Sequence, residues 1–144
     1  MRKQFRFEKL EVWHDARRLN QKLYQLSRVF PREEIYGLTS QLRRASVSVS
    51  ANIAEGSGRN SDKDFAHFLE LSYGSIMEVA SLMFLAFDEG YVSKDDLDLI
   101  LPEIECSAAR IAALNRSLKI QTTKTFLAPG AQREALDPRP STLD

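Results

Sequence analysis

The stretch YGLTSQLRRASVSVSANIAEGSGR, residues 36–59, decides the fold of this chain. Its apolar and smallest residues recur at steps of three and four, which places them on one face of an α-helix. Serine and alanine fill most of the remaining positions, and these small side chains let a neighbouring backbone come close. We therefore expect a tightly packed helix over about residues 35–55, ended by Gly56 and Gly58.

Three further segments have the same helical period, and no strand pattern competes with them. They cover about residues 10–28, 62–89 and 94–121. Ser61 and Ser93 are residues of the kind that cap helix N-termini, and Gly90 suits a helix end. Four helices joined by short connections predict an all-α fold, an up-and-down antiparallel four-helix bundle.

Prolines mark two features of the C-terminal part. Pro102 lies inside the fourth periodic segment, so either the helix kinks there or residues 94–101 form a short turn and the main helix starts at Pro102. Residues 122–144 contain three prolines and no periodic apolar face. We expect a bundle domain at residues 1–121 and a disordered tail at residues 122–144.

The segment at about 62–89 is apolar around more of its circumference than one buried stripe requires. Leu82, Phe84 and Leu85 fall partly outside that stripe, and they are candidates for contact between the subunits of a homo-oligomer. The alternative is a wide core face with a few exposed apolar side chains.

Net charge is zero, but it is distributed unevenly along the chain. Residues 1–60 contain 12 Lys and Arg against 6 Asp and Glu, a net charge of +6. Residues 61–120 contain 5 against 11, a net charge of −6. This asymmetry predicts either complementary contacts inside the fold or assembly, or one basic and one acidic face that suit a head-to-tail oligomer or an anionic partner.

Arginines of the basic half are candidates for contact with nucleic-acid phosphates, because a guanidinium donates paired hydrogen bonds. The candidates are Arg17, Arg18, Arg43, Arg44 and Arg59. Arg43 and Arg44 are consecutive, so they point about 100° apart and at least one is expected to face solvent. Their alternative role is to pair with carboxylates of a neighbouring subunit. Only Tyr24 and Tyr36 are available near them for base stacking.

Asn52 and Glu55 place polar groups in the last turns of the helix at about 35–55. Buried polar groups need partners, or each costs about 1–3 kcal/mol. We interpret these two residues as a structural polar network rather than as catalytic groups. Arg43 or Arg44 of another chain, Tyr36 and the loop amides near Ser57 are the expected partners.

Enzyme chemistry is hard to find in this sequence. His14 and His67 are the only histidines, no Cys/His cluster suggests a metal site, and the glycines at 56–58 follow a helix rather than the strand of a phosphate-binding loop. We predict no catalytic residues, no metal, no cofactor and no small-molecule substrate. One lone cysteine, no signal peptide and no apolar run of about 20 residues predict a cytoplasmic protein without a membrane segment.

Three motifs, taken in order, resemble the four-helix bundle family of 23S rRNA intervening-sequence proteins, sometimes labelled S23 ribosomal proteins. They are FEKLEVWHDAR at 7–17, YGLTSQLRRA with NIAEGSGR within 36–59, and KDFAHFLELSYGS at 63–75. The resemblance covers about residues 7–91 and implies a ring of five subunits. Diversity-generating retroelement accessory proteins resemble the same fold.

The sequence therefore favours a non-enzymatic structural or adaptor bundle of the 23S rRNA intervening-sequence type, with RNA or a nucleic-acid enzyme as its expected partner. The alternative is a retroelement accessory protein that binds a reverse transcriptase and nucleic acid. The balanced net charge lowers the weight of that alternative, because such accessory proteins are strongly basic.

Overall fold

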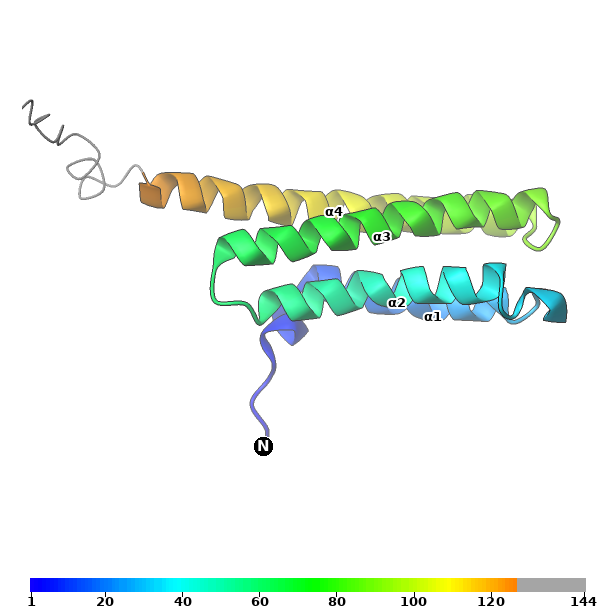
Figure 1. The fold of residues 1–144 in the computed structure, drawn as a ribbon, viewed down its shortest axis with the longest axis horizontal. Helices are drawn as coiled ribbons and strands as arrows, with labels where there is room; N and C mark the ends of the chain where they lie inside the picture. Colours follow the sequence, from blue (N-terminus) through cyan, green and yellow to red (C-terminus); the bar gives the residue numbers. More distant parts are fainter. Residues whose placement is uncertain (127–144) are drawn as a thin grey trace, which may run out of the picture.

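The structure is a computed structural model that describes residues 1–126. Within this range it contains four α-helices, two short 3-10 helices and no strand. The helices are α1 (Glu11–Ser27), α2 (Leu38–Ser57), α3 (Asp62–Asp88) and α4 (Lys94–Phe126); the 3-10 helices are η1 (Arg6–Lys9) and η2 (Arg32–Glu34). Consecutive helices run in opposite directions, so the predicted up-and-down antiparallel four-helix bundle is confirmed (Figure 1).

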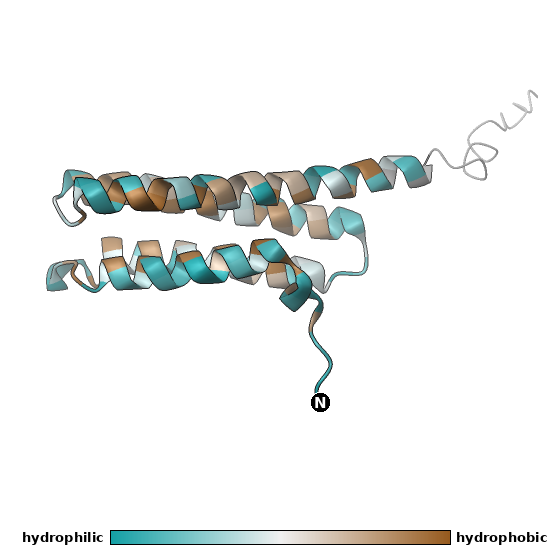
Figure 2. Cartoon of the chain, turned by 180° about the vertical axis from the view of Figure 1, so that it is seen from behind, coloured by the Kyte–Doolittle hydropathy of each residue, from teal (hydrophilic) through white to brown (hydrophobic). Residues whose placement is uncertain are grey.

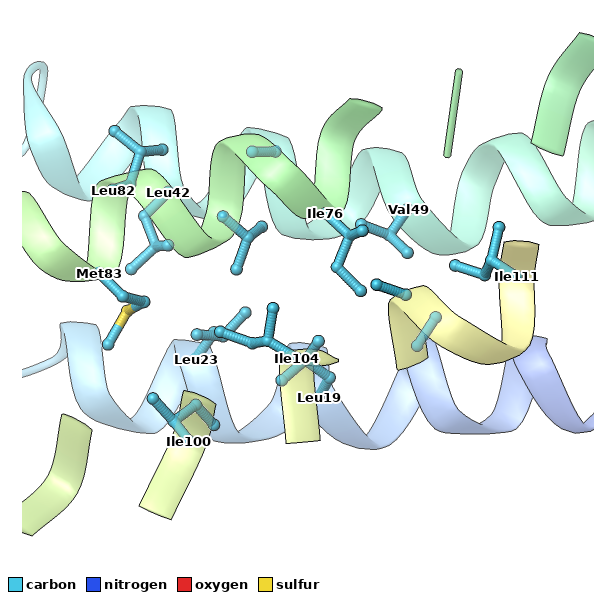
Figure 3. Packing of buried hydrophobic residues seen from close by; sticks show 14 of the residues in the cluster. Leu19, Leu23, Leu42, Val49, Ile76, Leu82, Met83, Ile100, Ile104 and Ile111 are labelled. Carbon is cyan, nitrogen blue, oxygen red and sulfur yellow. The ribbon is translucent and has the colours of Figure 1, made fainter. Parts of the chain in front are cut away.

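The bundle has two layers, with α1 beside α2 and α3 beside α4 (Figure 1). The contact between α2 and α3 is the most extensive, and α1 also touches α4, so the four helices enclose one core. Hydrophobic residues recur along every helix, as expected for helices that each turn a stripe inward (Figure 2). Leu23, Leu42, Ile76 and Ile104 are buried at its centre (Figure 3).

Capping side chains fix where the helices begin. The Ser61 hydroxyl accepts a hydrogen bond from the Asp64 amide at 3.1 Å, and the Ser93 hydroxyl accepts one from the Asp96 amide at 3.1 Å. Both predicted caps are therefore confirmed. Gly90 follows α3 with a φ of +77°, the left-handed conformation that favours glycine. The helix α2 begins at Leu38, later than predicted, because the Glu34 carboxylate accepts from the Leu38 amide and residues 32–34 form η2 instead.

Gly56 does not end α2, as the sequence suggested, but lies inside it and is buried. A Cβ placed on Gly56 would lie 2.6 Å from the Phe68 Cβ and 2.9 Å from the Phe65 Cδ2. The glycine is therefore required by the close approach of α2 to α3. Gly58 alone has the predicted terminating role, as the C-cap residue of α2.

The helix α4 is continuous through Pro102, which excludes a main helix starting at that residue. Pro102 is exposed, so the Asp98 carbonyl that lacks its usual amide partner lies on the solvent side of the helix. α4 also continues to Phe126, past the predicted end at residue 121. Residues 122–126 contain neither proline nor glycine, and nothing in them stops a helix. The rest of the predicted tail, residues 127–144, lies outside the described residues.

α3 is the one helix of the described part that is long and apolar enough to cross a membrane by length and composition. Its contacts with α2 and α4 are the two most extensive between helices of the bundle. Only 33% of its most apolar window is buried in the single chain, so exposed apolar side chains contribute to that composition.

Candidate assembly and nucleic-acid surfaces

The outer surface of α3 carries large apolar side chains that the single chain leaves in solvent. Phe84 and Leu85 are each 50% exposed. Three more lie along the same helix with exposures of 40–45%: Leu71, Tyr73 and Met77. We call these five residues the α3 outer face; by helical spacing Tyr73, Met77 and Phe84 lie on one side of it, and Leu71 and Leu85 lie on the other. Such a gathering of exposed apolar groups on one helix is typical of a surface that binds another protein.

Leu82 was predicted beside Phe84 and Leu85 at a subunit interface, and that prediction is wrong. Its side chain is only 5% exposed and belongs to the hydrophobic core of the single chain (Figure 3). The reason is helical spacing, since Leu82 follows Val79 by three residues and precedes Ala86 by four, and both of these are fully buried.

Arg43 is half-buried and held in place by two groups of α1. Its Nε donates a hydrogen bond to the Ser27 hydroxyl at 2.9 Å, and its guanidinium lies 4.8 Å from the centre of the Tyr24 ring. Ser27 is buried, so the bond fixes the arginine against the bundle. The contact with Tyr24 is a cation–π interaction. No carboxylate among residues 1–126 pairs with the remaining N–H groups of Arg43.

Arg44 points away from Arg43 and is exposed, as the helical spacing predicted. No ion pair forms at Arg44 within the described residues. It separates two hollows that share Ser40 and Ser48 as lining residues. One hollow, of about 570 Å³, has Tyr24, Ile35, Arg43 and Val47 in its wall. The other, of about 440 Å³, lies toward α3 and is lined by Tyr36 and Glu78.

We call the surface made by Tyr36, Arg43, Arg44, Val47 and Ile35 the α2 outer face. Tyr36 is 95% exposed, and Val47 and Ile35 are exposed as well. Sequence reasoning named the two arginines but did not include Ile35 and Val47. The position of Ile35 could not be predicted from helical spacing, because η2 and the turn after it interrupt the period.

The other three candidate arginines lie elsewhere and already have partners. Arg18 pairs with Asp15 at 2.6 Å, and Arg59 pairs with Glu55 at 3.0 Å. Arg17 lies over the Trp13 ring, 5.5 Å from its centre. The structure therefore brings together only Arg43 and Arg44 of the five.

Asp15 also accepts a hydrogen bond from Arg110 of α4 at 2.8 Å, which raises the pKa of the Arg110 guanidinium. Lys22 of α1 pairs in turn with Glu103 of α4. Residues 1–60 supply the net basic layer of α1 and α2, and residues 61–120 supply most of the net acidic layer of α3 and α4. Of these two ion pairs, only Lys22–Glu103 joins a base of the first layer to an acid of the second, because Asp15–Arg110 has the opposite sense. These two pairs therefore do not account for the charge asymmetry.

Asn52 and Glu55 do not share one network. The Asn52 amide donates to the Ser48 carbonyl and hydroxyl, both at 2.9 Å, and the Ser48 hydroxyl bonds to Ser75 of α3 at 2.9 Å. The Asn52 chain of bonds links α2 to α3. Glu55 instead faces solvent and pairs with Arg59 one turn further along the same chain.

Neither histidine has the surroundings of a catalytic base. One ring nitrogen of His14 bonds to the Glu8 carbonyl at 2.7 Å, which fastens η1 to α1, and His67 is exposed. No group of His, Cys, Asp or Glu within residues 1–126 has a metal-binding arrangement.

The sequence profile of one family, described as 23S rRNA-intervening sequence protein, matches residues 8–113. The chain belongs to this family. The match covers α1, α2, α3 and more than half of α4, so it extends beyond the motifs that suggested the family and includes both outer faces. A comparison with curated proteins finds no match.

Proposed function

We propose that this member of the 23S rRNA-intervening sequence protein family is a non-enzymatic adaptor that assembles with copies of itself. The observation that carries the proposal is the α3 outer face. Five large apolar side chains, more than on any other helix of the described residues, remain 40–50% exposed on α3. Covering them with a second chain removes apolar surface from water, at about 25 cal/mol for each Å².

A ring is the form of assembly that we propose. The two layers of the bundle differ in charge, so a head-to-tail contact can place a basic surface of one subunit against an acidic surface of the next. Head-to-tail contacts close into rings when the rotation between subunits permits it. The family resemblance implies five subunits, and an adaptor of that kind offers five copies of any partner site.

The test replaces both Phe84 and Leu85 with serine and compares the variant with Leu99→Ser. Leu99 lies on α4 and is 71% exposed, so its replacement removes a similar apolar group from a different surface. We expect the double variant to keep its helical circular dichroism while its mass by light scattering falls. Leu99→Ser is expected to keep the mass of the wild type. An unchanged mass for the double variant would contradict the proposed interface.

A further inference from the structure

The α2 outer face combines positive charge, an exposed aromatic ring and apolar hollows on one surface. Two guanidinium groups lie on it, and neither pairs with a carboxylate within residues 1–126. Glu78 is the one carboxylate among the residues that line the two hollows. The nearby Glu34 carboxylate accepts from the Leu38 amide at 2.7 Å, which holds it at the start of α2.

We propose that the α2 outer face binds an unpaired nucleic-acid strand. Arg44 and the free N–H groups of Arg43 contact successive phosphates, and Tyr36 stacks on a base. Two arginines without a carboxylate partner within residues 1–126 favour an anionic partner. The planar fork of arginine suits a phosphate, which accepts two parallel hydrogen bonds.

The aromatic ring favours a single strand over a duplex. Tyr36 is 95% exposed, so its ring is free to stack, and stacking requires a base that is not already paired and stacked inside a helix. Ile35 and Val47 give the larger hollow an apolar wall against which a second base can pack. A duplex keeps the faces of its bases stacked inside the helix, so it would offer the Tyr36 ring no base face to stack on.

Arg43 is already in position for this role. The Ser27 bond and the Tyr24 ring hold its guanidinium at the mouth of the larger hollow. A side chain held in place loses little conformational freedom when a ligand arrives. Arg44, which is exposed, supplies the second contact beside Ser40 and Ser48, which line both hollows.

This inference names the partner class of the proposed adaptor and rests on that role, so its test measures binding and oligomeric mass on the same samples. Fluorescently labelled oligouridylate, the matching single-stranded DNA and an RNA hairpin are titrated with the full chain at two salt concentrations. The variants are Arg44→Gln and Tyr36→Leu, with Tyr36→Phe retaining the ring. Arg18→Gln is the matched control, because it removes the same charge from an arginine that is already paired with Asp15.

We expect Arg44→Gln to weaken binding of the single strand about tenfold and to reduce the salt slope by about 0.7, the value for one phosphate contact on a single strand. Tyr36→Leu should weaken binding at least about fivefold, and Tyr36→Phe should bind like the wild type. Arg18→Gln should change the affinity for the single strand and its salt slope only by the small amount that follows from lowering the net charge of the protein by one. All variants should keep the mass of the wild type.

Preference for the hairpin over both single strands would overturn the proposal, as would equal losses for Arg44→Gln and Arg18→Gln. Labelled polyglutamate is titrated in the same way as a second anionic polymer; if it binds as tightly as oligouridylate, the face responds only to negative charge, and this too would overturn the proposal. A fall in mass for Arg44→Gln would assign Arg44 to subunit contact instead. A wild type that binds no strand while it remains assembled would remove the proposal and leave the adaptor role standing.

Discussion

Replacement of Gly56 by alanine tests the closest contact in the bundle. The new methyl group would lie 2.6 Å from the Phe68 Cβ and 2.9 Å from the Phe65 Cδ2. Phe65 can turn its ring, but the Phe68 Cβ moves only with the α3 backbone. Overpacking a core costs about 1–3 kcal/mol, and the backbone contact places this site in the upper half of that range, about 2–3 kcal/mol.

Gly58→Ala provides the matched control two residues away. Its φ of −86° suits alanine, and the nearest atom to a new Cβ, the Glu55 carbonyl oxygen, lies 3.5 Å away. At such a position alanine stabilises by about 0.4–1 kcal/mol, because it restricts the unfolded chain. Gly56→Ala restricts the unfolded chain in the same way, so the net loss in its free energy of unfolding is about 1–2.5 kcal/mol.

Thermal unfolding followed by circular dichroism at one fixed protein concentration measures both variants, since the stability of an assembly depends on concentration. At about 2.1 cal/mol/K per residue, the 126 described residues give an unfolding entropy near 0.26 kcal/mol/K. Gly56→Ala should therefore lower Tm by roughly 4–10 °C, and Gly58→Ala should raise it by roughly 2–4 °C. Equal Tm values for the two variants would refute the close approach of α2 to α3 at Gly56.

Three further predictions concern the core, a helix cap and the N-terminal segment. Leu82→Ala should lower the free energy of unfolding, measured in urea, by about 2–5 kcal/mol. Val29→Ala, at an exposed site, should change it by no more than about 0.5 kcal/mol. Similar values for the two variants would contradict the burial of Leu82. Ser61→Ala should cost about 1 kcal/mol by the loss of the α3 cap, and an unchanged urea midpoint would contradict the cap. The hydrogen bond from Arg2 lowers the pKa of the Glu8 carboxyl from 4.5 to about 2. The pair between Arg2 and Glu8 should therefore be fully formed above pH 4.5 and lost as the pH falls toward 2. An NMR titration of Glu8 with a midpoint near 4.5 would contradict the pair.

The four helices were predictable because each one has its own period of apolar residues, and most of their ends are marked by capping or terminating residues. Ser61, Ser93 and Gly90 mark ends by local chemistry, which a sequence displays directly. Gly56 could not be interpreted in the same way. A glycine that ends a helix and a glycine that admits a neighbouring helix look alike in sequence, and only the position of Phe68 distinguishes them.

The surfaces were predictable in part. The separate directions of Arg43 and Arg44 follow from helical geometry, and the structure has one half-buried and one exposed. The burial of Leu82 depends on how wide an arc of α3 the neighbouring helices cover, and the period of one helix does not show that width. The pairing of Glu55 with Arg59 was missed because partners were sought in other segments, although Arg59 follows Glu55 by only four residues, just after the end of α2.

The native mass of the full chain in solution tests the central claim most directly. One chain has a mass of 16.4 kDa. If the α3 outer face joins subunits, light scattering on the purified wild type at micromolar concentration will give several times that value, and five times for the proposed ring. A single species at 16.4 kDa would contradict self-assembly and the role given to Phe84 and Leu85.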